Sequence, residues 1–266
     1  MSNQQALKAI SRILNIFTSS EAQIRPHFML TGPSGSGKSH TIQSLADALQ
    51  IPMVEVNAAQ LTKEGTSGNS VSKALTPLLQ YGGMPVICFV DEFDKLFISG
   101  NSNSSLAHET TNGVQNEFLK VLEGRASIYG DYGKYVDIKT DNVLFVFAGA
   151  FNGEENIDLD RLREMGIKTE FLGRVGLAYG LEKLTLDDLR QILESSNLLA
   201  NYLELFTDAK KAEVVKAVMT VVEQNFEKNT IGARLINTLI HQYFINGGLN
   251  EKEARKVTFQ KTMTLH

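Results

Sequence analysis

The chain has 266 residues, of which 42% are hydrophobic and 21% charged, and this balance is ordinary for a folded protein long enough for one large domain with a small companion. Its 26 basic and 30 acidic side chains leave a formal charge of −4, which excludes a general electrostatic attraction for nucleic acid or an acidic membrane. The single cysteine, Cys88, excludes a disulfide within the chain, and no apolar run approaches about 18 residues, so we expect a cytoplasmic protein without a membrane span.

Helices and apolar, strand-like runs alternate through the first part of the chain. A helix is predicted over residues 6–17, and strands are predicted over 26–30, 52–56, 85–90 and 142–148. Such alternation is typical of an α/β fold in which a parallel sheet carries helices on both faces. One helix, one strand and a second helix fit between Lys38 and Asp91, which suggests that the strand before Asp91 is not simply the next one after residues 26–30.

A phosphate-binding loop is predicted directly after the first apolar run, where the chain matches the pattern G-x-x-x-x-G-K-[ST]. Its glycines allow positive φ angles, so that successive backbone N–H groups can turn inward around phosphate oxygens. Lys38 is expected to reach the β and γ phosphates and Ser39 to ligate Mg²⁺, at the start of a helix predicted over 39–49. The predicted nucleotide-binding residues are Gly32, Pro33, Ser34, Gly35, Ser36, Gly37, Lys38, Ser39 and His40.

An acidic pair, Asp91 and Glu92, ends the buried run that begins at Val86. The carboxyl end of such a strand is where a nucleotide-binding sheet places the carboxylate that holds Mg²⁺. Asp91 is expected to hold the metal through water and Glu92 to polarise the attacking water, so the chain is predicted to hydrolyse ATP with Mg²⁺. The alternative is that the pair only caps the segment after the strand.

The rest of the chain indicates a second, helical domain. Residues 98–111 and 128–135 are predicted loops on either side of a helix over 113–124. After about residue 183 the apolar period stays helical, beginning with a capping box of Thr185 and Asp188 and continuing through helices over 210–226 and 233–244. We predict a large nucleotide-binding domain over 1–182 and a small helical domain over 183–266. The five histidines do not have the spacing of a metal site.

Further segments resemble the AAA+ ATPases and, within them, the ClpX/HslU branch, over nearly the whole chain. These segments are Asp94-Lys95-Leu96, the stretch 113–124, Gly149-Ala150-Phe151, Glu170-Phe171-Leu172-Gly173-Arg174 and Gly232-Ala233-Arg234. The resemblance implies an α/β P-loop fold of three layers, followed by a small helical domain. It also implies assembly into a ring, most simply a homohexamer, that remodels a macromolecular partner.

The same resemblance implies roles for three polar residues. Arg174 matches the arginine finger, which neutralises charge at the γ-phosphate in a neighbouring subunit. Arg234 matches the second sensor, which reaches the nucleotide of its own subunit and couples the nucleotide state to the angle between domains. Asn152 is the candidate first sensor, which orients water near the γ-phosphate, although the alignment also allows Phe151. For each arginine the alternative is an ordinary surface charge.

Three departures from ClpX bear on the substrate of the ring. Gly65-Thr66-Ser67-Gly68 stands where ClpX has a Gly-aromatic-hydrophobic-Gly loop that grips a polypeptide, and threonine offers little apolar contact. Only about twenty residues separate Phe151 from Phe171, too few for the insertion by which ClpX docks on its peptidase. No zinc module is expected ahead of the core. We therefore expect no ClpP-type peptidase as a partner.

The predicted activity is ATP hydrolysis by a ring that remodels a partner, which we expect to be a protein. Tyr129, Tyr132 and Tyr135 with Lys134 are candidates for contacting peptide or bases in a central pore, or else they pack a hairpin. Two other interpretations remain open, a nucleic-acid-associated ATPase in which loop lysines such as Lys63 face phosphates, and a nucleotide-gated scaffold. A monomeric P-loop kinase is disfavoured, because it leaves the two arginines without a purpose.

Overall fold

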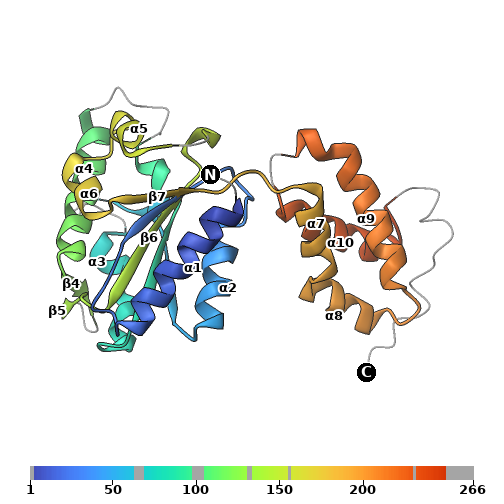
Figure 1. Cartoon of the computed structure of the whole chain (residues 1–266), viewed down its shortest axis with the longest axis horizontal. Coiled ribbons are helices and arrows are strands. Elements are labelled where there is room, and N and C mark those ends of the chain that lie inside the picture. Colours follow the sequence, from blue (N-terminus) through green and yellow to red (C-terminus); the bar gives the residue numbers. More distant parts are fainter. Residues whose placement is uncertain are drawn as a thin grey trace. The chain divides into compact units, whose positions relative to one another are not determined.

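The structure, a computed structural model, describes residues 3–62, 69–97, 105–130, 134–154, 157–229 and 232–249, without the side chains of 105–111 and 228. These residues form two compact units, the first holding the residues up to Pro33 and from Lys38 to Glu182, and the second holding Ser34–Gly37 and the residues from Lys183 onward. The first unit combines helices and strands, and the second is made of helices (Figure 1). None of the described helices is long and apolar enough to cross a membrane.

A five-stranded parallel sheet forms the centre of the first unit, in the order β2-β3-β6-β1-β7. Strands β1, β3 and β6 are buried along almost their whole length, which is why each is a continuous apolar run in the sequence. Along the chain β2 comes between β1 and the strand that ends in Asp91, as the spacing suggested, and in the sheet β6 lies between β3 and β1. The strands are β1 (Phe28–Thr31), β2 (Met53–Asn57), β3 (Val86–Asp91), β6 (Val143–Gly149) and β7 (Leu177–Gly180).

Helices cover both faces of this sheet, so that the first unit has three layers (Figure 1). Leu144 and Val146 of β6 belong to the core beneath α1 and α2, whereas Phe145 and Phe147 belong to the core beneath α3, α4 and α6. This alternation follows from the two-residue period of a strand, whose successive side chains point to opposite faces. The helices are α1 (Asn3–Ser19), α2 (Lys38–Ala48), α3 (Val71–Ala74), α4 (Ser105–Leu122), α5 (Leu159–Glu164) and α6 (Thr169–Arg174).

Helix α1 contains the predicted helix over 6–17. Its buried residues stand at positions 6, 10, 13, 14 and 17, the spacing that places one apolar stripe on a helix. The helix ends near Ser19, because Glu21 and Ala22 take the left-handed conformation and the Ala22 N–H returns to the carbonyl oxygen of Phe17 at 2.9 Å.

An antiparallel hairpin of β4 (Arg125–Tyr129) and β5 (Tyr135–Lys139) follows α4. The prediction of a loop over 128–135 was wrong at both ends, because Ile128 and Tyr129 belong to β4 and Tyr135 begins β5. Alternating apolar residues at 126, 128, 136 and 138 were the available signal, and the glycines and tyrosines between them obscured it. Short 3₁₀ segments complete this unit, namely η1 (Ala58–Gln60), η2 (Thr76–Tyr81), η3 (Phe93–Leu96) and η5 (Phe151–Gly153).

The second unit is a small bundle with one core. The Thr185 hydroxyl accepts a hydrogen bond from the Asp188 N–H at 3.1 Å, and the Asp188 carboxylate accepts one from the Thr185 N–H at 2.8 Å, so the predicted capping box is confirmed. Val218 and Met219 lie in the core, as the apolar stripe of their helix predicted. The elements are α7 (Leu186–Glu194), α8 (Asn197–Leu205), α9 (Lys211–Asn225), η6 (Phe226–Lys228) and α10 (Arg234–Asn246).

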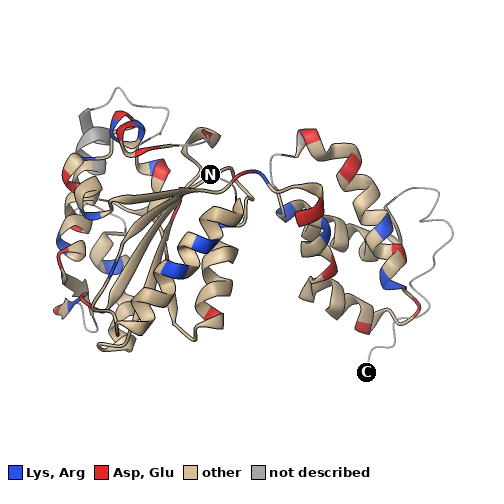
Figure 2. Cartoon of the chain, viewed as in Figure 1, with Lys and Arg blue, Asp and Glu red and all other residues tan. Residues whose placement is uncertain are grey.

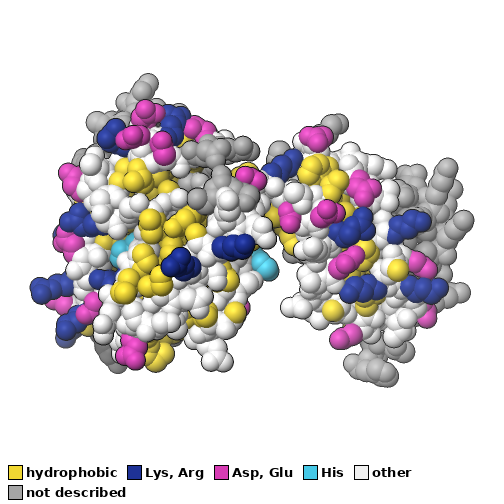
Figure 3. Space-filling view, in the orientation of Figure 1, with side chains coloured by type: hydrophobic (Ala, Val, Ile, Leu, Met, Phe, Trp, Pro, Cys, Tyr) yellow, Lys and Arg dark blue, Asp and Glu magenta, His cyan; other side chains and the backbone are white. Residues whose placement is uncertain are grey.

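Charged residues of both signs are dispersed along the described parts of both units (Figure 2). A space-filling view shows the same mixture on one face, where acidic and basic groups surround smaller hydrophobic patches (Figure 3). Neither view shows an extended basic face among the described residues, which agrees with the net charge of −4.

Candidate active site

The loop between β1 and α2 has the backbone of a phosphate-binding site. Strand β1 ends at Thr31 and α2 begins at Lys38, so that residues 32–37 form the loop. Gly35 and Gly37 have φ angles of 75° and 86°, a left-handed conformation that strains any residue with a side chain. Glycine is therefore required at these two positions, in a conformation that lets backbone N–H groups converge on an anion.

The ammonium group of Lys38 is held by this loop. Its Nζ donates hydrogen bonds to the carbonyl oxygens of Gly32 at 2.7 Å and Pro33 at 3.0 Å. The hydroxyl of Ser36 is buried and has no hydrogen-bond partner among the described residues. Because a buried hydroxyl without a partner is costly, Ser36 fits a site in which an anionic oxygen accepts its hydrogen bond.

Helix α2 adds the positive end of its dipole to the loop, and its first turn contains no acidic residue. Ser39 is half-buried at the second position of the helix, where the motif expects a Mg²⁺ ligand. His40 is exposed, and its Nδ1 lies 3.5 Å from the hydroxyl of Ser44. The loop amides, the Lys38 ammonium and the serine hydroxyls together fit a polyphosphate that carries Mg²⁺.

The acidic pair stands at the end of β3. Asp91 is half-buried, and its Oδ1 accepts a hydrogen bond from the Glu92 N–H at 2.8 Å. Glu92 has a φ of 55° and begins η3 without capping it through its side chain. Its exposed carboxylate makes no hydrogen bond or ion pair with any residue that the structure describes. Capping therefore does not account for Glu92, whose left-handed backbone is of a kind that clusters at active sites.

Three parallel strands bring these groups to one edge of the sheet. Thr31 of β1 lies beside Gly149 of β6, and Val90 of β3 lies beside Phe147 of β6. The phosphate-binding loop, the acidic pair and the turn after β6 therefore all follow the carboxyl ends of adjacent strands. Open α/β sheets bind their ligands at this edge.

The turn after β6 carries Asn152, the candidate first sensor. Asn152 is exposed and has a φ of 57°, whereas Phe151 is completely buried. A buried phenyl ring has no group that orients water, so Asn152 is the residue of this pair that suits the expected role.

The two candidate arginines lie in different units. Arg174 ends α6, and its guanidinium forms an ion pair with Glu123 and donates a hydrogen bond to the carbonyl oxygen of Glu170 at 3.0 Å. Arg234 begins α10, is exposed, and makes no ion pair with a described residue. The surface contact expected as the alternative for Arg174 is thus present, and the roles of both arginines in catalysis stay predictions.

A known family matches the span that holds this site. Residues 28–171 match the family described as "ATPase family associated with various cellular activities (AAA)". The chain belongs to the AAA family. The matched span runs from β1 into α6 and includes the phosphate-binding loop, the acidic pair and Asn152. Membership makes the chain an ATPase with an α/β P-loop fold, as the sequence predicted.

The curated relatives of this AAA chain include ClpX proteins. It is 30% identical over 255 residues to the "ATP-dependent Clp protease ATP-binding subunit ClpX 2" of Wolinella succinogenes, covering 82% of this chain and 64% of that protein. It is 27% identical over 280 residues to the ClpX subunit of Porphyromonas gingivalis, covering 88% of this chain and 68% of that protein. The chain thus spans about two thirds of the length of these relatives or slightly less. They confirm the resemblance to the ClpX branch.

Several residues predicted to contact a substrate lie outside the described residues, namely Lys63, Gly65, Thr66, Ser67, Gly68 and Tyr132. The prediction of a loop over 98–111 was wrong at its end, because α4 begins at Ser105, while residues 98–104 lie outside the described part of the AAA chain. Tyr129 and Tyr135 are described, and their rings meet edge to face across the hairpin with centroids 5.5 Å apart. The two tyrosines therefore pack the hairpin, although Tyr135 remains 51% exposed and accessible to a partner.

The thiol of Cys88 and the imidazole of His27 are chemically reactive groups, but in this chain both are buried and serve the packing of the fold. Cys88 is wholly buried in β3, and burial raises the pKa of its thiol, so it acts as a small hydrophobic residue. The Nδ1 of buried His27 accepts a hydrogen bond from the Phe145 N–H at 3.1 Å, and burial, together with the charge of Arg25, lowers the pKa of His27 to about 3.

Among the described residues, no group of three or more His, Cys, Asp or Glu is placed to hold a metal. Mg²⁺ here would need nucleotide phosphates among its ligands.

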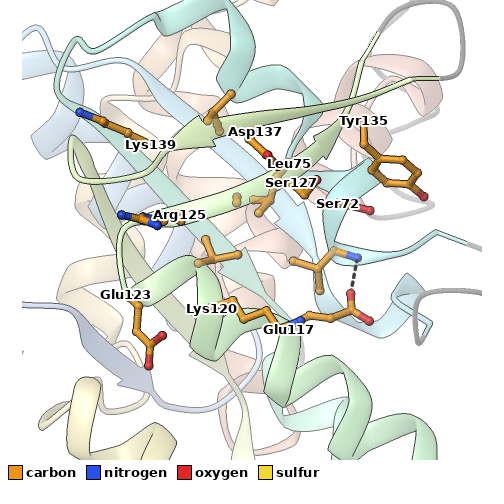
Figure 4. Close-up of a pocket in the computed structure, with 14 residues that line it drawn as sticks. Ser72, Leu75, Glu117, Lys120, Glu123, Arg125, Ser127, Tyr135, Asp137 and Lys139 are labelled. Carbon is orange, nitrogen blue, oxygen red and sulfur yellow. Dashed lines mark hydrogen bonds between the residues drawn. The ribbon is translucent and has the colours of Figure 1, made fainter.

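A groove of about 1120 Å³ lies between α3, α4 and the hairpin (Figure 4). Its wall includes Glu117, which accepts a hydrogen bond from the Val71 N–H at 3.3 Å, and its remaining charges mix acids such as Asp137 with bases such as Lys139. Tyr135 lines this groove, but none of the predicted nucleotide-binding, metal or catalytic residues does, so the groove is separate from the nucleotide site of the AAA chain.

Proposed function

We propose that this chain is the ATPase core of a homohexameric ring that hydrolyses Mg²⁺-ATP in order to remodel a macromolecule, in the first place a protein. The observation that carries the proposal is the shared carboxyl edge of β1, β3 and β6. This edge is followed by Lys38 in the first loop, Glu92 after the second strand and Asn152 in the turn after the third.

Different side chains of the chain have different roles in ATP hydrolysis. Lys38 and the loop amides bind and orient the β and γ phosphates, while Ser39 and, through water, Asp91 would hold Mg²⁺. Bound Mg²⁺ neutralises negative charge on the phosphate oxygens. The exposed carboxylate of Glu92 polarises the attacking water, and the amide of Asn152 orients it.

Assembly is proposed from Arg174 and from the names of the relatives. In the ClpX pattern that it matches, Arg174 supplies positive charge to the γ-phosphate of a neighbouring subunit. The relatives are named as ATP-binding subunits of an ATP-dependent protease, which supports a chain that works in an assembly and on protein. Arg234 is proposed to sense the nucleotide of its own subunit.

We further propose that the ring does not feed a ClpP-type peptidase. Between Phe151 and Phe171 the described chain forms η5, α5 and the first residues of α6, and only residues 155–156 lie outside the description. These short elements include no long docking insertion. Thr66 in place of a pore aromatic supports the same proposal, because threonine offers little surface for gripping a polypeptide.

The charge distribution favours protein over nucleic acid as the substrate. Affinity for nucleic acid comes largely from clustered Lys and Arg that neutralise phosphates. In the described part of the chain, basic residues are interspersed with acidic ones (Figure 2), and the chain as a whole carries a charge of −4.

The test is the ATPase rate of the purified chain, measured with an unfolded protein, with single-stranded or duplex DNA, and with neither. We expect Mg²⁺-dependent hydrolysis that rises with the unfolded protein alone. A rise with DNA alone would instead favour a nucleic-acid-associated ATPase, and a rate that responds to neither would favour a nucleotide-gated scaffold. Lys38→Ala, prepared in parallel, reports the background from contaminating ATPases.

A further inference from the structure

Asp94 is a buried carboxylate, two residues after Glu92, to which none of the roles above is assigned. It lies in η3, and only 1% of the residue is exposed. Burying a carboxylate costs free energy unless the group is hydrogen-bonded or paired with a positive charge. We therefore expect Asp94 to have hydrogen-bonding or ionic partners that offset this cost.

Those partners lie mainly on the turn after β6. The Oδ2 of Asp94 accepts a hydrogen bond from the Phe151 N–H at 3.2 Å, and the Lys95 ammonium lies 3.7 Å from the same oxygen. The Oδ1 lies so close to Gly149 that a Cβ at position 149 would be 2.7 Å away from it. The missing side chain of Gly149 therefore makes the space through which the carboxylate reaches the turn.

The turn that Asp94 contacts has an unusual backbone. Phe151 and Asn152 are consecutive residues with side chains, and both have positive φ angles, 45° and 57°. Such a pair persists only where the surrounding structure holds it. The first of the two donates its N–H to Asp94, and the second is the candidate for orienting water.

We propose that Asp94 is a positioning residue that fixes the turn after β6 and thereby sets Asn152 relative to Glu92. Glu92 and Asp94 belong to one short backbone segment, so the hydrogen bond to Phe151 joins the segment with the water-polarising carboxylate to the segment with the water-orienting amide. The inference rests on the proposed role of Asn152. It concerns activation of water and leaves the nucleotide-binding loop untouched.

The first test separates turnover from binding. Asp94→Ala removes the acceptor for the Phe151 N–H, and we expect kcat to fall about 10- to 100-fold, the effect of a misplacement of about 1 Å, while KM for ATP changes less than about two-fold. Asp94→Asn keeps an acceptor oxygen and should recover most of the lost kcat. Gly149→Ala places a Cβ 2.7 Å from Oδ1 and 2.8 Å from the ring of Phe151, so it disturbs the same contact from the other side and should also lower kcat. Asp208→Ala, at an exposed position of the second unit, is the matched control and should turn over like the wild type.

The second test asks whether Asp94 acts through Asn152. We expect Asn152→Ala to lower kcat by itself and the double variant with Asp94→Ala to be no slower. If Asn152→Ala turns over at the wild-type rate, the proposed role of Asn152 fails and the inference fails with it. If Asn152→Ala is slow but the two losses multiply, the role of Asn152 stands and the inference about Asp94 is overturned.

Hydrogen exchange at the Phe151 amide gives a readout that does not depend on catalysis. We expect slow exchange in the wild type and in Asn152→Ala, fast exchange in Asp94→Ala, and intermediate exchange in Asp94→Asn. Equal exchange in the wild type and Asp94→Ala would overturn the inference, as would a loss of ATP affinity as large as the loss of kcat. Should Asp94→Ala fail to fold, the same comparisons between Asp94→Asn, Gly149→Ala and the wild type decide the matter.

Discussion

Arg174 at the end of α6 forms an ion pair with Glu123, the residue that follows α4. The two side chains are 37% and 56% exposed, and ion pairs at such positions contribute only about 0–1 kcal/mol to stability. The guanidinium is thus held at the surface, and its release costs little. This arrangement suits a residue that exchanges its carboxylate for the phosphate of a neighbouring subunit.

Arg174→Ala is expected to bind ATP like the wild type and to hydrolyse it roughly 10³-fold more slowly, because the charge that stabilises the transition state is lost. The wild-type rate per subunit should also fall steeply on dilution below the assembly concentration. Steady-state ATPase assays over a dilution series, with sedimentation to report the assembly, test both statements. A monomer whose turnover does not depend on concentration would refute action between subunits.

Mixing variants gives a sharper form of this test. Glu92→Gln subunits keep the arginine, and Arg174→Ala subunits keep the glutamate, so a mixed ring contains some sites in which both groups are intact. Activity should therefore appear on mixing two inactive preparations. Glu123→Ala is the matched control, since it removes the partner of Arg174 within the subunit and should leave at least half of the wild-type activity.

Glu92→Gln is expected to retain ATP binding while turnover falls by about 10² to 10⁴, the usual contribution of a positioned base. The exposed carboxylate makes no hydrogen bond or ion pair with a described residue, so its replacement should cost little stability. Lys38→Ala, by contrast, should lose nucleotide binding. Binding of a fluorescent ATP analogue and single-turnover hydrolysis separate these outcomes, and wild-type turnover in Glu92→Gln would show that another group polarises the water.

The phosphate-binding loop and the strand before the acidic pair were predictable, because their backbone conformation and burial permit only certain residue types. Gly35 and Gly37 hold φ angles that other residues tolerate poorly, and the strand before Asp91 is buried on both faces and therefore apolar throughout. Such requirements produce a pattern within a short stretch of sequence, which can be recognised before the fold is known. The same holds for the capping box of Thr185 and Asp188, which spans four residues.

The features that we did not predict from the sequence depend on contacts between segments far apart in the chain or lack a pattern of their own. Asp94 stands among other charged residues and gives no sign that it is buried, because its partner at Phe151 is 57 positions away. Strand β7 was not predicted either, since it is only four residues long and at the edge of the sheet, where Leu177 remains exposed. Neither feature has a periodic signature of its own.

The stability of the first unit is expected to fall at acidic pH because of His27. Its pKa in the folded protein is about 3, below the ordinary value of 6.5, because burial and the charge of Arg25 disfavour the protonated ring. Between these two pH values the unfolded chain binds a proton that the folded chain does not, so the free energy of unfolding decreases as the pH falls from 6.5 toward 3. Above pH 6.5 the full stability is present.

Urea unfolding between pH 7 and about pH 4.5 measures this slope, which for one group is at most about 1.4 kcal/mol per pH unit. His27→Gln keeps an acceptor for the Phe145 N–H and should flatten the profile, whereas His241→Gln, at an exposed position, should not. Parallel profiles for wild type and His27→Gln would show that other groups govern the acid sensitivity.

Thr66 in place of a pore aromatic predicts that the wild-type ring is a poor processive unfoldase. A loop that pulls on a folded domain must hold its substrate against a stability of about 5–15 kcal/mol, and threonine supplies little apolar contact for that grip. Thr66→Tyr should therefore strengthen threading, and Thr66→Ala should change little. The measurement is the loss of native fluorescence from a tagged, stably folded fluorescent protein in the presence of ATP, with and without a ClpP-type peptidase. Rapid loss with the wild-type ring would show that another loop grips the substrate, and the exposed ring of Tyr135 would be the first to replace by alanine.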